Sequence, residues 1–353
     1  MNEKKINCIE GLKAICWIGV FSCCFKNSFL PYSSIWMDGT PLRFLYSGNQ
    51  CIRMLFVISG FLLSYKYFTE QNYENGLKDI CKKYFYLMPA VLFTEVLVCI
   101  FMSVGGVYNL EASIISGSEN FLGAYNQFKP NLFACLKEAL FSTYFSGTNV
   151  YVEPLWVLKY EYLGTFLIIA VLVIFKKSSW RWLFYGVFLV AFNGYYNYFV
   201  LGMLICDLVI NCEIVEKIKK TYFSYTMMIG GFVFFSLTNL NDFDKYNRIV
   251  FAIGLILFFI GFLKCDAMDK VLGNRLMVGL GEISYFAYII YLPVIEILSC
   301  GLLLILYEKI QYKILIVLIF FITFLSIVFC ASLMKYYIGA LSHCISKRIE
   351  EIE

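Results

Sequence analysis

Long runs of apolar residues recur along the whole chain and are separated by shorter polar and charged segments. A run of about 17–25 apolar residues can cross the hydrocarbon core of a bilayer, which is about 30 Å thick. Because lipid offers no partner to unpaired backbone groups, each such run is expected to be a helix. We therefore predict an all-α polytopic membrane bundle, a single integral-membrane domain over 1–353 with about ten transmembrane helices. The expected spans are 9–30, 50–67, 84–107, 154–175, 180–194, 196–213, 222–239, 248–264, 279–305 and 314–338.

Basic residues are distributed unevenly between the segments that connect these spans. With the N-terminus in the cytoplasm, the inner segments carry 18 Lys and Arg residues and the outer segments carry 7. Cytoplasmic loops of membrane proteins are enriched in these residues. The distribution predicts that both termini are cytoplasmic.

Composition narrows the possible functions. The chain is 60% hydrophobic and 15% charged, against about 25% charged in a soluble domain. The net charge of +4 follows from the excess of inner basic residues, and no nucleic-acid partner is expected. The 14 cysteines form no C-x-x-C pair, so no metal site is expected. The first apolar run contains Lys13 and Lys26 and lacks a small-residue cleavage site, which argues against a cleavable signal peptide.

The first, second and fourth runs carry ionisable residues, which usually mark functional sites inside a membrane. These residues are Lys13, Arg53, Lys159 and Glu161. Glu10 precedes Lys13 by three residues, so the two can pair on one helix face. Snorkelling to the membrane edge is the alternative for Lys159 and Arg53, whereas Glu161 is short and is expected to be functional or paired with Lys13 or Arg53.

The one histidine, His343, lies beyond the last expected span. Any chemistry inside the membrane must therefore proceed without an imidazole, the usual general base near neutral pH.

The longest segment outside the expected spans is 108–153, which the predicted orientation places outside the cytoplasm. It contains a Ser- and Gly-rich piece at 113–124 and an amphipathic stretch near 131–145. Loops of this length are often functional. The segment could form a lid or a glycan-contacting surface, or it could be a plain connector.

Six pieces of the chain resemble, in the same order, the motifs of the membrane acyltransferase 3 family. They are EGLKAICWIGVFSCC at 10–24, MLFVISGFLLSY at 54–65, KKYFYLMPA at 82–90, LWVLKYE at 155–161, YFVLGML at 198–204 and GEISYFAYIIYLPV at 281–294. The resemblance implies a multi-pass protein of the cytoplasmic membrane of a bacterium. It implies transfer of an acyl group, usually acetyl from acetyl-CoA, to hydroxyls of a cell-surface or lipid-linked polysaccharide.

The family's catalytic positions are changed in this chain, although its scaffold positions are kept. Cys24 and Tyr291 hold the places of the two family histidines, and Lys13 holds the place of an arginine. Lys83 and Tyr86 hold the places of an arginine pair, and Arg53 stands where an aspartate is common. The residues that match the family are Ser59, Gly60, Phe61, Trp156, Glu161, Gly202, Gly281, Ser284 and Tyr285.

Acyl transfer to a hydroxyl needs a base, donors for an oxyanion and a grip on the phosphates of CoA. Glu161 is a candidate base, and Cys24 is a candidate nucleophile if a nearby cation or base activates its thiol. The catalytic candidates are Glu161, Lys13, Cys24 and Tyr291, and those for binding the acyl-CoA donor are Lys82, Lys83 and Tyr86. Residues expected to bind substrate or to support the motifs are Arg53, Ser59, Trp156, Ser284 and Tyr285.

Two other functions fit parts of the pattern. The loss of both histidines is also typical of a catalytically inactive relative that binds glycan or lipid or partners an active enzyme. Ten spans with a large outer segment would also suit a glycan transporter or polymerase, although the family motifs argue against that class.

Overall fold

The structure is a computed structural model that describes residues 3–33, 39–70, 75–176, 178–218, 221–237 and 245–351. Within these ranges every regular element is a helix, and no strand occurs. The all-α expectation is therefore confirmed for the described residues. His343 lies in one of these helices, but its side chain is outside the described part.

The α-helices are α1 (Glu3–Phe29), α2 (Gly48–Glu70), α3 (Gly76–Ser103), α4 (Asn109–Ser116), α5 (Leu132–Lys137), α6 (Thr143–Phe145), α7 (Trp156–Phe175), α8 (Trp180–Ala191), α9 (Tyr196–Ile210), α10 (Ile214–Lys217), α11 (Thr221–Leu237), α12 (Lys245–Lys264), α13 (Asp266–Val271), α14 (Arg275–Glu282), α15 (Ser284–Val294), α16 (Cys300–Leu306), α17 (Tyr312–Met334) and α18 (Ala340–Glu351). The 3₁₀ turns are η1 (Pro41–Tyr46), η2 (Leu122–Ala124) and η4 (Glu153–Leu155). The π-helical turns are η3 (Glu138–Ser142), η5 (Ile295–Ser299) and η6 (Lys335–Gly339).

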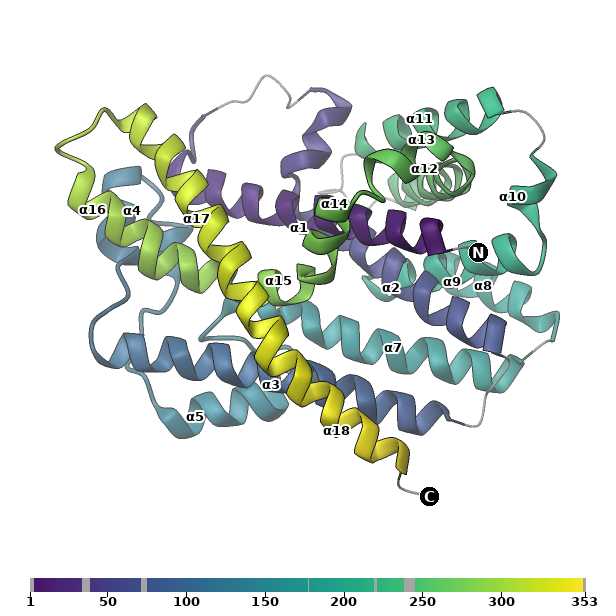
Figure 1. Ribbon diagram of the computed structural model, residues 1–353, viewed down its shortest axis with the longest axis horizontal. Helices are drawn as coiled ribbons and strands as arrows, with labels where there is room; N and C mark the ends of the chain where they lie inside the picture. Colours follow the sequence, from purple (N-terminus) through teal and green to yellow (C-terminus); the bar gives the residue numbers. More distant parts are fainter. Residues whose placement is uncertain are drawn as a thin grey trace. The chain divides into compact units, whose positions relative to one another are not determined.

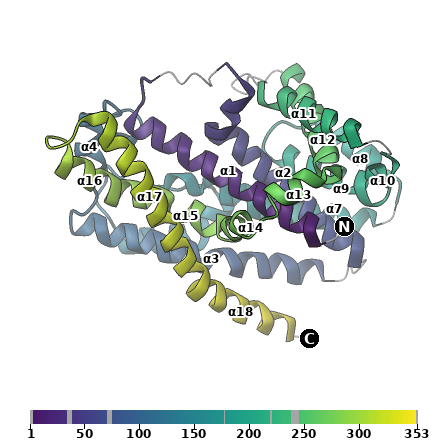
Figure 2. The same cartoon turned by 45° about the horizontal axis from the view of Figure 1, so that its top comes forward.

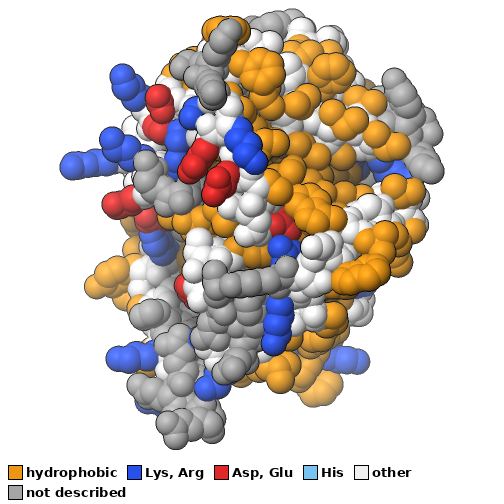
Figure 3. Space-filling view, turned by 90° about the vertical axis from the view of Figure 1, so that its right-hand side faces the viewer, with side chains coloured by type: hydrophobic (Ala, Val, Ile, Leu, Met, Phe, Trp, Pro, Cys, Tyr) orange, Lys and Arg blue, Asp and Glu red, His pale blue; other side chains and the backbone are white. Residues whose placement is uncertain are grey.

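Among the described residues, six helical stretches are long and apolar enough to cross a membrane. They are Glu3–Phe29, Gly48–Glu70, Gly76–Ser103, Glu153–Phe175, Ser284–Leu306 and Tyr312–Ser342. The helices α8, α9 and α11 are apolar but shorter. Apolar side chains cover much of the face in Figure 3, and charged side chains gather toward one side of it. These features fit a helical membrane bundle, and the ten spans and the cytoplasmic termini stay predictions.

The chain packs as two compact units. The first, unit 1, contains residues 1–20, 34–80 and 163–282, and the second, unit 2, contains 21–33, 81–162 and 283–353. The boundaries fall inside α1, α3 and α7. The prediction of a single domain stays a prediction, and each unit is described by itself.

In unit 1, α2 and α9 pack directly against each other because glycine removes the side chain at the contact (Figures 1 and 2). A Cβ added at Gly60 would collide with the carbonyl oxygen of Phe199, and one added at Gly202 would collide with the carbonyl oxygen of Val57. Small residues let membrane helices approach closely. The glycines of two family motifs therefore serve the packing of this helix pair.

The first part of α1 packs on α14 in a similar way. A Cβ at Gly281 would collide with the carbonyl oxygen of Glu10, and the indole N–H of Trp17 donates to the carbonyl oxygen of Leu280 at 3.1 Å. The pair α11 and α12 also meets at glycines, because Gly231 has no room for a Cβ against Phe258.

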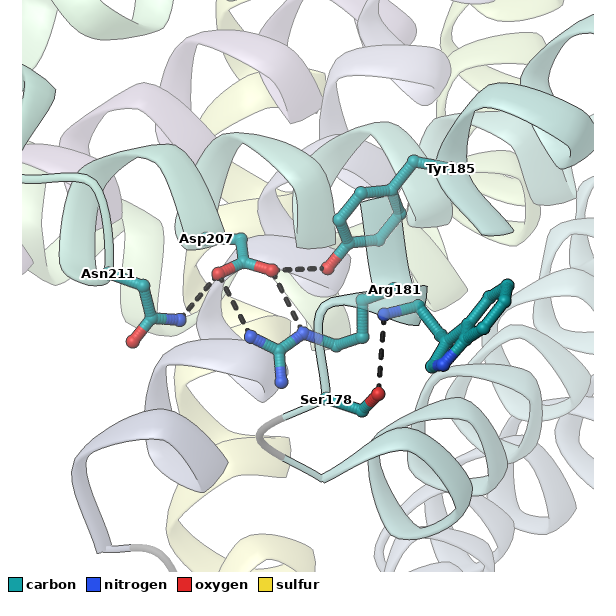
Figure 4. A network of polar contacts seen from close by, with 6 residues as sticks. Ser178, Arg181, Tyr185, Asp207 and Asn211 are labelled. Atoms are coloured by element: carbon teal, nitrogen blue, oxygen red, sulfur yellow. Dashed lines mark hydrogen bonds and ion pairs between the residues drawn. The ribbon is translucent and has the colours of Figure 1, made fainter. Parts of the chain in front are cut away.

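A buried ion pair joins α8 to α9 (Figure 4). Arg181 donates from Nε to Asp207 Oδ2 at 3.0 Å and from Nη2 to Oδ1 at 3.2 Å. The hydroxyl of Tyr185 also donates to Oδ2, at 2.8 Å, and Asn211 donates to Oδ1. Asp207 is fully buried. Because its two oxygens accept four hydrogen bonds, we interpret this network as structural.

Unit 2 contains the segment that was predicted to lie outside the spans, and this segment is largely helical. Residues 132–145 of this segment form a continuous helical stretch from α5 through η3 to α6. Near its start, the hydroxyl of Ser118 donates to the carbonyl oxygen of Ser28 at 2.7 Å, which ties the segment to the end of α1. The segment is therefore an integral part of unit 2.

Candidate functional site

The predicted site residues divide between the two units. Lys13, Arg53 and Ser59 belong to unit 1, and the other nine belong to unit 2. The amine of Lys13 lies 2.7 Å from Glu10 Oε2, which confirms the expected pairing one turn apart. Ser59 is half-buried in α2.

Four predicted residues of unit 2 meet where α3, α7 and α15 supply side chains. The amine of Lys83 lies 2.6 Å from Glu161 Oε1. The rings of Tyr86 and Tyr285 lie 5.5 Å apart, centroid to centroid, and Tyr285 is close enough to Glu161 for an electrostatic interaction. The hydroxyl of Tyr285 donates to the carbonyl oxygen of Leu87 at 2.7 Å. We call Lys83, Tyr86, Glu161 and Tyr285 the lysine–glutamate cluster.

The lysine–glutamate cluster contains the candidate base and one of the candidate phosphate ligands. Glu161 pairs with Lys83, which is not a partner that the sequence pattern had suggested. While the pair is closed, the ammonium group of Lys83 is occupied by a carboxylate. Binding of a CoA phosphate there would therefore exchange one anion for another.

The two positions that replace the family histidines also lie together. Tyr291, on α15, is close enough to Cys24, on α1, for an electrostatic interaction, and it has the same relation to Tyr125 and Glu153. The rings of Tyr288 and Tyr291 are 5.6 Å apart, and the hydroxyl of Tyr288 donates to the carbonyl oxygen of Pro154 at 2.9 Å. The fold therefore gathers phenols, a thiol and a carboxylate where imidazoles would be expected.

Glu296 adds a fully buried carboxylate to this group. It lies on the π-helical turn η5, and such turns are frequent at functional sites. The side-chain amide of Asn126 donates to Glu296 Oε2 at 2.9 Å, whereas Oε1 has no hydrogen-bond partner. A buried polar atom without a partner is costly. One oxygen of Glu296 is thus available to a ligand or a reacting hydroxyl.

The segment 108–153 supplies two residues to this group. Asn126 has a φ of +55°, a left-handed conformation that is uncommon for residues other than glycine but enriched for asparagine. Its neighbour Tyr125 is half-buried. Burial raises the pKa of the Tyr125 phenol, and nearby Cys24, Glu153 and Glu296 raise it further. Tyr125 therefore stays neutral and can donate a hydrogen bond at neutral pH.

We call Cys24, Tyr125, Asn126, Glu153, Tyr288, Tyr291 and Glu296 the polar core cluster. Glu153 is exposed, at the start of η4, whereas Cys24 and Glu296 are buried. The carboxylates that interact with Cys24 are those of Glu296 and Glu153. Carboxylates disfavour a thiolate, so these neighbours do not provide the cation that a nucleophilic Cys24 would need.

The remaining predicted residues of unit 2 have plainer surroundings. Lys82 is half-buried on α3, and Ser284 is buried at the start of α15. The ring of Trp156 lies 5.7 Å from that of Tyr160. In the described part of the chain, no three His, Cys, Asp or Glu side chains are placed to hold a metal ion.

Three members of the polar core cluster, Cys24, Tyr288 and Tyr291, lie in the family motifs quoted above, whereas the sequence pattern missed the other four, Tyr125, Asn126, Glu153 and Glu296. A signal existed for Glu296, because it lies within the ninth expected span, where a carboxylate marks a functional site by default. Tyr125 and Asn126 belong to an irregular segment without a motif, and only the fold brings them to Glu296.

Comparison with known proteins gives one match. A family model described as an acyltransferase domain matches residues 6–335 of the chain. No curated protein and no solved structure matches it. The family model covers most of the chain, and the six motifs quoted above lie within the matched residues. The chain therefore belongs to the membrane acyltransferase 3 family.

Proposed function

We propose that this protein is a membrane O-acyltransferase. It transfers an acetyl or other acyl group from a cytoplasmic acyl-CoA to a hydroxyl of a cell-surface or lipid-linked polysaccharide, in the cytoplasmic membrane of a bacterium. Family membership supports the acyl transfer. The observation that carries the proposal is the buried carboxylate of Glu296, which has one unpaired oxygen and is close enough to Cys24 and Tyr125 for an electrostatic interaction.

In this reaction the hydroxyl oxygen attacks the thioester carbonyl carbon, the carbon–sulfur bond breaks, and the hydroxyl proton ends on the CoA thiol. A carboxylate can take that proton first, as a general base. Two carboxylates of unit 2 are candidates, Glu161 in the lysine–glutamate cluster and Glu296 in the polar core cluster. The phenols of Tyr125 and Tyr291 can donate hydrogen bonds to the oxyanion that forms on the thioester oxygen.

The donor is proposed to bind beside the lysine–glutamate cluster. Lys82 and Lys83 lie near the cytoplasmic end of α3 in the predicted orientation, where they would hold the phosphates of CoA as point charges. The acceptor would approach from the opposite side, where the outer segment supplies Tyr125 and Asn126.

The test uses membranes that contain the full-length protein, radiolabelled acetyl-CoA and polysaccharide from the producing cells. The readout is base-labile label in the polysaccharide. If Glu296 is the base, Glu296→Gln lowers the rate about 10²–10⁴-fold, whereas Glu308→Gln, at an exposed position of the same unit, leaves it unchanged. Loss with Glu161→Gln alone would assign the base to Glu161. If Glu296→Gln and Glu161→Gln both keep the wild-type rate, neither carboxylate acts as the general base.

A catalytically inactive relative is the second candidate function. The observation that favours it is the replacement of both family histidines by Cys24 and Tyr291, with carboxylates rather than cations near the thiol. In that case wild-type membranes transfer no label, although the protein still binds glycan or lipid or an active partner. Family membership gives no support to a glycan transporter or polymerase.

A further inference from the structure

Unit 2 contains a third set of buried polar side chains, which belongs to neither of the two clusters. It lies where α3 meets α6 and the residues 146–152 that follow α6. Its members are Glu95 on α3, Thr143 and Tyr144 on α6, and Asn149. Glu95, Thr143 and Tyr144 are fully buried, and Asn149 is half-buried. We call these four residues the Glu95 group.

Hydrogen bonds connect three members of the Glu95 group. The side-chain amide of Asn149 donates from Nδ2 to the hydroxyl of Thr143 at 2.9 Å. That hydroxyl lies 3.2 Å from Glu95 Oε1 and 3.1 Å from the carbonyl oxygen of Glu138, and it can donate its one proton to either. Tyr144 follows Thr143 in the chain and is close enough to Glu95 for an electrostatic interaction. The four side chains therefore meet at one place.

Three atoms of the Glu95 group are buried without a hydrogen-bond partner among the described residues. They are Glu95 Oε2, the hydroxyl oxygen of Tyr144 and Asn149 Oδ1. A buried polar atom is costly to leave unpaired, and native interiors contain few such atoms. Three of them on adjoining side chains therefore indicate a ligand that they share.

The chemistry of the three unpaired atoms indicates what this ligand is. A carboxylate oxygen and an amide oxygen only accept hydrogen bonds, whereas a phenol hydroxyl can donate one. The ligand must therefore donate two hydrogen bonds and accept one. An anion is disfavoured, because Glu138 lies close enough to Glu95 to add a second carboxylate. The burial of Glu95 and Tyr144 requires a small ligand, and water is small and has the right donors and acceptors.

The residues 146–152 are held in place by contacts on both sides of Asn149. Glu138 Oε1 accepts hydrogen bonds from the N–H groups of Val150 and Tyr151, and the hydroxyl of Ser146 lies 3.0 Å from that of Thr148. These contacts fix the backbone around Asn149, so its side-chain oxygen is positioned before any ligand binds. A ligand shared with Glu95 would then join these residues to α3.

We propose that the Glu95 group binds one internal water molecule, which donates hydrogen bonds to Glu95 Oε2 and Asn149 Oδ1 and accepts one from the hydroxyl of Tyr144. Buried waters typically make about three hydrogen bonds to polar groups that otherwise have no partner. The water joins residues 146–152 to α3. This site is independent of the proposed acyl transfer and uses no member of the lysine–glutamate cluster or the polar core cluster.

The test is X-ray footprinting of the full-length protein in detergent, read by mass spectrometry of its peptides. Radiolysis of a bound water produces hydroxyl radicals, which oxidise the adjacent side chain even where bulk water cannot reach. Tyr144 is therefore expected to be oxidised although it is fully buried. The internal control is Tyr185, which is also buried and whose hydroxyl donates to Asp207. Tyr185 should stay unmodified.

Two variants show whether the water causes the oxidation of Tyr144. Asn149→Leu removes one acceptor and is expected to lower this oxidation severalfold, because the water loses one of its hydrogen bonds. The matched control is Thr148→Val, at the exposed neighbouring position, which should leave the oxidation unchanged.

Thermal unfolding gives a second measurement. Tyr144→Phe removes only the hydroxyl, and if that hydroxyl pairs with the water, the midpoint is expected to fall by about 2–4 °C. A midpoint equal to or above that of wild type would show that the hydroxyl has no partner and would overturn the proposal.

Three other results would overturn it as well. The first is oxidation of Tyr144 in wild type as low as that of Tyr185. The second is oxidation of Tyr144 that Asn149→Leu leaves unchanged or increases. The third is a midpoint that is higher in sodium chloride than in choline chloride for wild type but not for Asn149→Leu, because the ligand would then be a cation.

Discussion

At the scale of single residues, the two clusters of unit 2 show how ionisable groups are placed in sites whose members include no histidine. Each carboxylate has a different environment. Glu161 has a cation beside it, Glu296 has an amide and one unpaired oxygen, and Glu153 is exposed. Because environment determines how strongly a carboxylate holds a proton, these groups can serve different roles despite identical chemistry.

The pairing of Lys83 with Glu161 leads to a prediction on stability. Both side chains are partly shielded from solvent, with 29% and 15% of their surfaces exposed. Replacing either partner alone, as Lys83→Met or Glu161→Gln, is expected to lower the free energy of unfolding by roughly 1 kcal/mol. The double variant should lose less than the sum of the two single variants. Thermal unfolding in detergent measures this coupling, and additive losses would show that the two groups do not interact.

Glu138, on η3 of the segment 108–153, leads to a prediction on pH dependence. It is buried, and its Oε1 accepts hydrogen bonds from the N–H groups of Val150 and Tyr151 at 2.6 and 3.0 Å. Burial raises its pKa, although the two N–H groups oppose the change. A folded state with a raised pKa binds its proton more tightly than the unfolded state, so stability falls as the pH rises through that value.

The variant Glu138→Gln is neutral at every pH and escapes this loss. The difference between its midpoint of thermal unfolding and that of wild type is therefore expected to increase, in favour of the variant, from pH 5 to pH 8. The exposed Glu119→Gln of the same segment is the control and should show no such trend. A constant difference between wild type and Glu138→Gln would contradict the expected effect of burial.

At the scale of helices, the family motifs of unit 1 are explained by packing. Gly60 and Gly202 lie where α2 and α9 touch, and each faces a backbone carbonyl of the other helix. The motif sequences SGF and LGML therefore specify a close helix pair. At Gly60 and Gly202, the motif residues by which the family was recognised are therefore explained by helix packing.

Gly202→Ala tests this explanation. The added methyl group would meet the carbonyl oxygen of Val57, and the helices would have to separate, which is expected to cost about 1–3 kcal/mol. Gly230→Ala is the matched control, because a Cβ there has nothing within 4 Å and alanine favours a helix by about 1 kcal/mol over glycine. Thermal unfolding distinguishes the two, and equal stability of both variants would exclude the close contact as a constraint.

At the scale of the whole molecule, the sequence predicts the fold class and the family better than the site. Runs of apolar residues and glycine-containing motifs are local signals, and they led to helices and to the correct family. The site depends on contacts between distant segments. Glu161 and Lys83 were both named from the sequence, yet their pairing, 78 residues apart, appears only when α3 and α7 pack.

The polar core cluster shows the same limit more clearly. Cys24 and Tyr291 were identified because motif positions marked them, but their shared neighbours were not. Tyr125 and Asn126 come from the segment 108–153, but they lie outside its amphipathic stretch near 131–145 and in no motif. Their role follows from the hydrogen bond of Asn126 to Glu296, 170 residues away, which no local pattern can encode.

The ion pair between Arg181 and Asp207 also bears on how the chain enters the membrane during synthesis. Arg181 is the second residue of α8 and Asp207 is the fourth from the end of α9, so the cost of inserting a charge at the centre of an isolated helix, about 2.5–3.5 kcal/mol, is an upper bound for each. The helix α8 has 12 residues, fewer than the about 20 that usually span a bilayer. Neither α8 nor α9 is therefore well suited to insert alone, whereas a hairpin of both neutralises the two charges. The translocation machinery would then have to retain α8 until α9 has emerged from the ribosome.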